Sequence, residues 1–253
     1  MNTLPALPLV PLDTEIAAIA RDYARVNGPV MAILNRLGGG LERQMAKLPE
    51  TLRNQIESVT AQALNAAHAA AGQIARAPDM GPRGDLVAAM ASGAAGGAGG
   101  IATSLAELPV TITLILRAIR REAVVAGFDP ELPAIRAACL DVFASGGPLS
   151  DDDGVNSAFV SARLTMTGPA LQKLISTVAP RLAATLGQKL AAQAVPVLGA
   201  VSGAAINAAY LRYFRDLARI RFALMRLSVA YGAENVLASF ANATAAPRIT
   251  KAL

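Results

Sequence analysis

Tryptophan is absent from this chain of 253 residues, and aromatic residues make up only 4% of it, although 53% of the residues are hydrophobic. A core of this composition consists mostly of small and aliphatic side chains, which requires its elements to approach one another closely. Runs that alternate apolar and polar residues, as half-buried strands do, are also missing. We therefore predict an all-α fold, a multi-helix bundle with two glycine- and alanine-rich central helices.

Cysteine and histidine are nearly absent, since Cys139 and His68 are the only ones. A single cysteine forms no internal disulfide and indicates a reducing compartment. Prolines interrupt the apolar N-terminus and no basic residue precedes it, so it does not resemble a signal peptide. We expect a cytoplasmic protein, with a peripheral position at the inner membrane as a further option. His68 has no partner at ligand spacing, so we expect no metal and no cofactor.

Catalytic signatures are missing as well. The residues from Gly97 to Ala102 match a dinucleotide-binding pattern but follow no strand, so the match is rejected. The chain contains no phosphate-binding loop, zinc-protease motif, nucleophile elbow or CxxC pair. Histidine-based triads are available only through His68. These absences weigh against an enzyme, although a mechanism based on a lysine and a glutamate stays open.

The formal net charge is +5, without any block of five or more basic residues. Aromatic residues are too few to stack on bases, so a membrane surface suits this charge better than nucleic acid. One basic stripe stands out near the C-terminus, where arginines alternate with apolar residues: Arg212, Arg215, Arg219 and Arg226. This stripe is either a contact for anionic lipid or a partner, or an exposed helix face whose arginine stems cover apolar surface.

From the sequence we expect an extended arm over residues 1–12, one helical domain over residues 13–244 and a frayed tail over residues 245–253. Two segments of the domain carry no charge, Leu86–Ala106 and Leu190–Leu211. Both are long enough to cross a bilayer, but alanine and glycine dominate them. Buried helices of a soluble protein, partial immersion and spanning all stay open. Glycines four residues apart allow the two segments to pack on each other.

The junction after the first of these segments combines an acid, a proline and an apolar run. Glu107 is the first charge, and Pro109 is expected to break or kink the helix. Val110–Leu116 is the most lipid-like run of the chain, and Arg117 follows it. If this run faces outward, it favours a membrane or a partner; if it faces inward, it favours a core or a pocket.

Two stretches together resemble the EcsC family of bacterial proteins, named for a component encoded beside an ABC-type exporter. They are the glycine run with ELPVTITLILRAI and the later GFD, within Gly93–Asp129, and KLAAQAVPVLGAVSGAAIN with the helix behind it, from Lys189 onward. The resemblance spans about residues 86–231. The family often has an aspartate where this chain has Glu107. The resemblance implies a helical fold and an association with membrane transport or secretion, without an established reaction.

Carried over by position, the polar members of the family pattern are Glu107, Arg117, Lys189 and Asn207. They predict either a buried polar cluster that binds a ligand, or ion pairs of Glu107 with Arg117 or Lys189 that only neutralise charge inside the core.

Three functions follow as hypotheses. The first is a non-catalytic EcsC-type protein that associates with a membrane surface or a membrane transporter. The second is a soluble binding protein for a lipid or another apolar ligand. The third is a hydrolase of unknown substrate with Glu107 and Lys189 as its working pair.

Overall fold

The computed structural model describes residues 10–26, 49–69, 80–98, 100–144 and 199–245. Within these ranges the chain forms seven α-helices and no strand, which confirms the all-α prediction. The helices are α1 (Leu12–Val26), α3 (Glu50–Ala69), α5 (Gly81–Ala98), α6 (Gly100–Val125), α7 (Pro133–Ala144), α10 (Gly199–Tyr231) and α11 (Ala233–Thr244).

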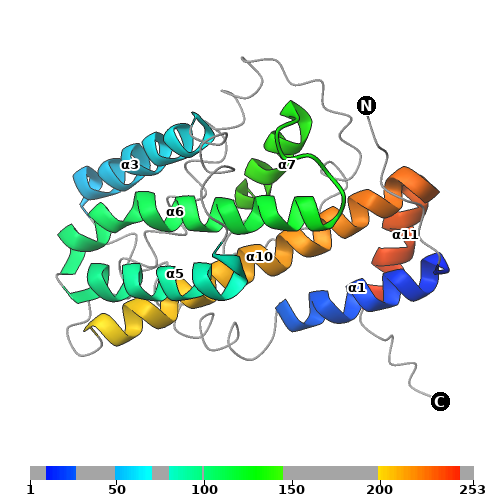
Figure 1. Cartoon of the computed structure of the whole chain (residues 1–253), viewed down its shortest axis with the longest axis horizontal. Coiled ribbons are helices and arrows are strands. Elements are labelled where there is room, and N and C mark those ends of the chain that lie inside the picture. Colours follow the sequence, from blue (N-terminus) through cyan, green and yellow to red (C-terminus); the bar gives the residue numbers. More distant parts are fainter. Residues whose placement is uncertain (1–9, 27–48, 70–79, 99, 145–198, 246–253) are drawn as a thin grey trace.

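Helix α10 is the axis of the bundle and contacts α1, α5, α6, α7 and α11 (Figure 1). Its aromatic side chains Tyr210, Phe214 and Phe222 are all but fully buried. A helix that is apolar around most of its circumference is stable only when neighbours cover it on several sides. The scarce aromatic residues of the chain are thus concentrated where the most helices meet.

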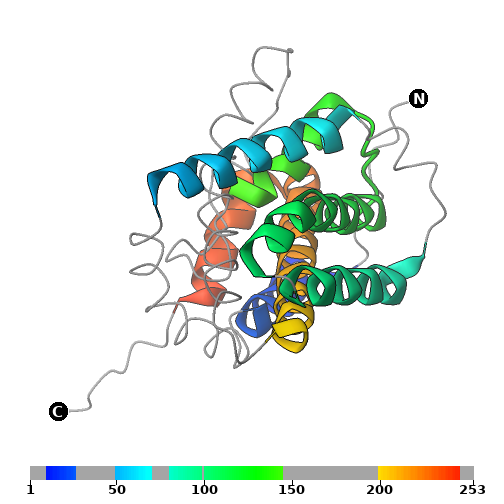
Figure 2. The ribbon, with the colours of Figure 1, turned by 90° about the vertical axis from the view of Figure 1, so that its left-hand side faces the viewer.

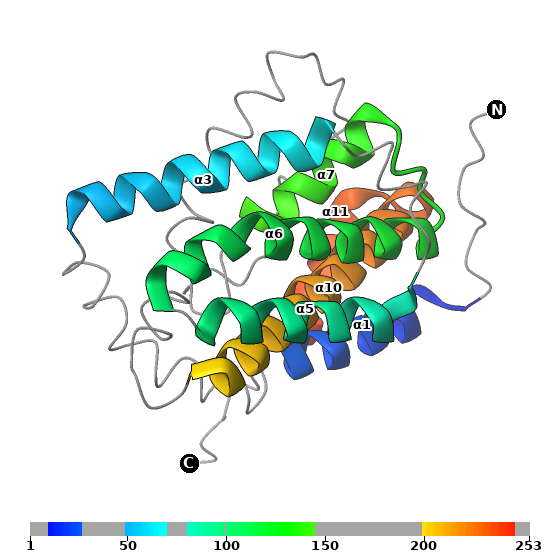
Figure 3. The same cartoon turned by 60° about the vertical axis from the view of Figure 1, so that its left-hand side comes forward.

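The other helices form two groups around α10. Helices α5 and α6 run antiparallel to each other along the N-terminal half of α10, and α3 lies against α6 (Figures 2 and 3). Helices α1 and α11 pack on each other and on the C-terminal half, where the rings of Tyr23 and Phe240 meet edge to face. Gly232, with φ of 83°, makes the turn from α10 into α11.

Glycine brings α5 and α10 into backbone contact. A Cβ atom at Gly93 would lie 2.2 Å from the carbonyl oxygen of Gly203 and 2.7 Å from Cγ of Asn207. No side chain fits in that space, so only glycine permits this approach. The contact joins the two charge-free segments, as the four-residue glycine spacing predicts.

Two helix boundaries refine the sequence prediction. The segment Leu86–Ala106 is not one helix, because α5 ends at Ala98 and α6 begins at Gly100. Of the break or kink expected at Pro109, the break is not found, because α6 continues to Val125. The proline is exposed, so the hydrogen bond that its missing N–H cannot make is lost on the solvent side of the helix.

The glycine contact yields a stability prediction. Replacing Gly93 with alanine forces its Cβ against the backbone of α10, and we expect a loss of about 1–3 kcal/mol in the free energy of unfolding. Urea unfolding followed by circular dichroism measures this loss. Ala91→Leu adds more volume at an exposed position of the same helix and serves as the control, with an expected change within about 0.5 kcal/mol. Equal effects of the two substitutions would contradict the proposed contact.

Candidate functional site

A buried polar cluster lies where α5, α6 and α10 meet. It consists of Ser92 on α5, Glu107 and Thr111 on α6, and Asn207 on α10; we call it the Glu107 cluster. Glu107 is 7% exposed and Asn207 is 1% exposed. Buried polar groups are stable only when hydrogen bonds satisfy them, so the partners of these side chains decide what the cluster does.

One carboxylate oxygen collects the hydrogen bonds of all three helices. Glu107 Oε1 accepts from Ser92 Oγ at 2.7 Å, from Asn207 Nδ2 at 2.7 Å and from the Thr111 hydroxyl. The Asn207 amide also donates to the carbonyl oxygen of Ala89 at 3.0 Å. A hydrogen bond to a charged acceptor is stronger than one between neutral groups. The cluster therefore links α10 to both α5 and α6.

The second carboxylate oxygen depends on a glycine for its space. A Cβ atom at Gly96 would lie 3.2 Å from Cβ, Cγ and Oε2 of Glu107. The Gly96 carbonyl oxygen accepts hydrogen bonds from Thr103 Oγ1 at 2.7 Å and from Ser104 Oγ at 2.9 Å. These bonds hold the end of α5 against the start of α6. Gly96 thus belongs to the same site as Glu107.

Of the four residues that the sequence predicts to form one polar cluster, the structure shows two in contact. Glu107 and Asn207 share a hydrogen bond, whereas Arg117 lies ten residues further along α6, about 15 Å away along the helix axis. The expected Glu107–Arg117 ion pair is therefore not formed. Lys189 lies outside the described residues. The ligand-binding role of this set stays a prediction.

Arg117 belongs to a second cluster, with a partner that the sequence analysis missed. Asp85 at the start of α5 is 1% exposed, and its two oxygens meet Arg117 Nε at 3.5 Å and Arg121 Nη1 at 2.5 Å. Two guanidinium groups thus neutralise one buried carboxylate. The available signal was the position of Asp85, the last acid before the charge-free segment.

Ser92 and Thr111 were also missed, although each carried a signal. Ser92 is the only polar side chain between Leu86 and Ala98. Thr111 follows Glu107 by four residues, which places both on one face of a helix. Side chains that are polar without being charged are easily overlooked, yet the three donors to the carboxylate named above are all of this kind, and two of them were missed.

The basic stripe of α10 is largely neutralised within the chain. Arg215 and Arg219 bind Asp216 at 3.0 and 2.5 Å, and Arg219 also lies 3.6 Å from Glu122 of α6. Arg226 binds Glu15 of α1 at 3.1 Å. Arg212 is exposed. Three of the four arginines are thus ion-paired, and two of them, Arg219 and Arg226, join α10 to another helix. This pairing reduces the charge that the stripe offers to a lipid surface.

A further arginine of α10 was not singled out in the sequence. Arg221 is fully buried, and its Nη1 donates to the backbone carbonyl and to the carboxylate of Asp141 on α7, both at 3.2 Å. A buried guanidinium requires such partners to offset its lost hydration. Arg221 therefore fixes α7 to the axis of the bundle.

The apolar run Val110–Leu116 points mostly inward. Ile112, Ile115 and Leu116 are at most 4% exposed, whereas Val110 is 50% exposed. The interior of the run belongs to the core, which favours the core or pocket interpretation. Val110 instead belongs to the outer face of α6.

That outer face continues onto α5 as a surface without charge. All exposed residues of the two helices from Leu86 to Leu116 are neutral, and we call them the neutral surface: Val87, Met90, Ala91, Ala95, Ala98, Ala102, Thr103, Ala106, Pro109 and Val110. Val87 is 65% exposed and Met90 41%. Glu107, the one charged residue in this stretch, is buried. Such an apolar surface marks an interaction site more often than chance exposure does.

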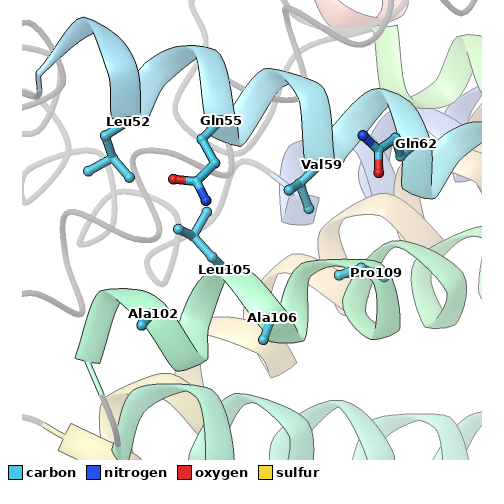
Figure 4. A pocket seen from close by; sticks show the side chains of 8 residues that line it. All are labelled: Leu52, Gln55, Val59, Gln62, Ala102, Leu105, Ala106 and Pro109. Carbon is cyan, nitrogen blue, oxygen red and sulfur yellow. The ribbon is translucent and has the colours of Figure 1, made fainter.

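A groove lies beside the neutral surface, between α3 and α6 (Figure 4). Its volume is about 710 Å³. The lining comes from four residues of each helix: Leu52, Gln55, Val59 and Gln62 of α3, and Ala102, Leu105, Ala106 and Pro109 of α6.

Nucleophiles and metal ligands are scarce near these sites. Burial raises the pKa of the Cys139 thiol to about 12, so it carries its proton at neutral pH and is a poor nucleophile. Among the described residues, no group of three or more histidine, cysteine, aspartate or glutamate side chains could hold a metal ion.

The shared carboxylate oxygen predicts the effect of a charge change. Asn207→Asp replaces the donor to Glu107 Oε1 with a second carboxylate, and we expect it to lower the free energy of unfolding by about 3–5 kcal/mol. Adding Glu107→Gln restores a donor and an acceptor across the same contact and should recover much of this loss. A double-mutant cycle in urea measures the coupling. Additive effects of the two changes would contradict direct contact.

Glu122 predicts a pH dependence of stability. Burial raises the pKa of the Glu122 carboxyl above the ordinary 4.5, and this effect outweighs the lowering by the positive charges of Arg219 and Arg215. A raised pKa means that the folded state holds the proton more tightly, so this contribution to stability is present below the ordinary pKa and is lost as the pH rises through the folded-state pKa. Glu122→Gln should therefore gain stability relative to the unsubstituted protein as the pH rises from 4.5.

Glu131 supplies the control for this experiment, because its pKa shifts the other way. Hydrogen bonds from Arg136 and the charge of Arg120 lower the pKa of this carboxyl. Its contribution is present above the ordinary pKa and is lost as the pH falls through the folded-state pKa. Urea midpoints over a pH series should diverge in opposite directions for Glu122→Gln and Glu131→Gln. Parallel profiles would refute the assignment.

Comparison with known proteins gives one match. No curated protein and no solved structure matches the chain. The model of the EcsC protein family matches residues 46–227, which is more than half of the chain. The match begins well before the resemblance over residues 86–231, so it includes α3 as well as the Glu107 cluster and the groove. The chain belongs to the EcsC protein family.

Proposed function

We propose that this EcsC-family protein is a non-catalytic helical protein that associates peripherally with a membrane surface or a membrane transporter at the cytoplasmic side. The observation that carries the proposal is the neutral surface of α5 and α6. It exposes Val87, Met90 and Val110 over a stretch in which the one charged side chain, Glu107, is buried. Soluble monomers seldom leave such a surface uncovered.

Helix α6 supports contact with a membrane more than insertion into it. Among the described helices, only α6 is long and apolar enough to span a bilayer, over Ala102–Val125. Half of its most apolar window is buried inside the bundle, as in a core helix of a soluble protein. Insertion would have to break the Glu107 cluster and the Asp85 ion pairs. Contact through the exposed half of α6 leaves both intact.

The basic stripe supplies a weaker, electrostatic contribution to this proposal. Arg212 is exposed and Arg219 keeps a side-chain exposure of 45% despite its ion pairs. Exposed arginines attract anionic headgroups, and salt screens this attraction. We therefore expect an apolar contribution to binding that resists salt and a smaller one that depends on it.

Flotation with liposomes tests the proposal. The protein should float with neutral phosphatidylcholine vesicles, and more strongly with anionic phosphatidylglycerol vesicles at low salt. Val87→Asp and Val110→Asp each remove an exposed valine that the membrane would cover. Each should lower the partitioning into vesicles about tenfold, since burial of a valine side chain contributes roughly 1.5 kcal/mol or more.

Val229→Asp is the matched control, because Val229 is also 50% exposed but lies near the end of α10. It should float like the unsubstituted protein. Loss of flotation with Arg212→Glu but not with Val87→Asp would place the contact on the stripe. A protein that stays in the soluble fraction under all conditions would refute membrane association.

A further inference from the structure

The groove between α3 and α6 has the composition of a site for a hydrocarbon chain. None of the eight lining residues within the described part of the chain is ionisable, and six of them are apolar. A charged ligand would lose hydration there without gaining a charged partner, whereas a hydrocarbon loses nothing. The volume of about 710 Å³ lies within the roughly 300–1,000 Å³ range of small-molecule sites.

The groove is continuous with the neutral surface. Ala102, Ala106 and Pro109 of α6 belong to both. A chain that leaves a bilayer under the neutral surface can therefore enter the groove without passing a charged side chain of α6. Ala102 and Ala106 have short side chains, so they fill little of the space between α3 and α6 in this part of the groove.

The α3 wall adds a polar group. Gln55 is exposed and extends across the groove toward Leu105 (Figure 4). Its amide can donate a hydrogen bond to an ester carbonyl at the end of an acyl chain. Gln62, further along the same wall, already donates to Ser58 Oγ at 3.1 Å. Gln55 lies between Leu52 and Val59 on this wall (Figure 4), so the groove offers a hydrogen-bonding group partway along a mostly apolar lining.

We propose that this groove holds one acyl chain of a phospholipid taken from the membrane that the neutral surface contacts. The inference rests on the proposed membrane association and adds a ligand class to it. The protein would hold a lipid chain between α3 and α6 while the bundle stays folded around the Glu107 cluster.

Tryptophan fluorescence tests the groove, because the chain has no tryptophan of its own. Gln55→Trp places a single reporter at the groove. Asn54→Trp places one on the same helix at an exposed position outside the groove lining. Each protein is mixed with phosphatidylcholine vesicles with or without brominated acyl chains, which quench tryptophan on contact. We expect a loss of fluorescence several times larger for Gln55→Trp than for Asn54→Trp.

A blocking substitution provides a second measurement. Ala106→Phe, made in the Gln55→Trp protein, fills the groove from an exposed position of α6 and should abolish most of the quenching. Ala95→Phe adds the same side chain on α5, outside the groove, and should leave the quenching in place. Quenching that survives Ala106→Phe would overturn the proposal.

The outcomes separate the groove from the membrane association. A protein that floats without quenching of Gln55→Trp overturns the groove and leaves the membrane association standing. Equal losses at Gln55→Trp and Asn54→Trp indicate that α3 itself contacts the bilayer, which also overturns the groove. Quenching of Gln55→Trp in a protein that does not float keeps the groove and overturns the membrane association. Neither flotation nor quenching overturns both.

Discussion

The backbone contact between α5 and α10 at Gly93 and Gly203 is the constraint on which the rest of the bundle depends. At that distance no side chain can separate the helices, so the neighbouring positions must supply the cohesion. Asn207, one turn beyond Gly203, reaches across to the carbonyl of Ala89 and to Glu107. The glycines bring the backbones close enough for these hydrogen bonds to form, and the hydrogen bonds compensate for burial of the carboxylate.

Charge is distributed to suit this arrangement. Among the described residues, three buried charged side chains form ion pairs: Asp85 with Arg117 and Arg121 of α6, Arg221 with Asp141 of α7, and Arg120 with Glu131 in the turn after α6. Such pairs contribute little net stability compared with apolar packing, but they penalise any register in which a partner is lost. Close packing of alanine and glycine tolerates sliding, since small side chains interlock weakly. The ion pairs therefore specify a register that the glycine contact alone would leave loose.

Much of the fold was predictable from sequence, because helical periodicity and glycine spacing are local signals. The all-α class and the approach of the two charge-free segments follow from them. The ion-pair and hydrogen-bond partners of individual side chains were harder to predict than the fold. Simple helix geometry separates Glu107 from Arg117, but no local pattern identifies Asp85 as the partner of Arg117. The Arg226–Glu15 bond joins residues 211 positions apart, so the stripe could be recognised as one helix face but its neutralisation could not. At Pro109 the sequence left a break and a kink open, and the exposure that lets α6 continue past this proline depends on tertiary packing.

The neutral surface includes the outer side of α5, the helix that makes the glycine contact with α10. A helix that packs through glycine on one side and carries alanine on the others has few side chains long enough to hold a charge away from its neighbours. Helix α5 accordingly carries no charge after Asp85, and its exposed face is as apolar as its buried one. Solubility alone would favour lysine or glutamate at exposed positions such as Ala91 and Ala95, where they cost almost nothing in helix propensity. Packing accounts for the small residues on the inside, but it does not account for their absence of charge on the outside. The proposed contact with an apolar surface would account for it, and the proposed lipid site in the groove between α3 and α6 adjoins that surface.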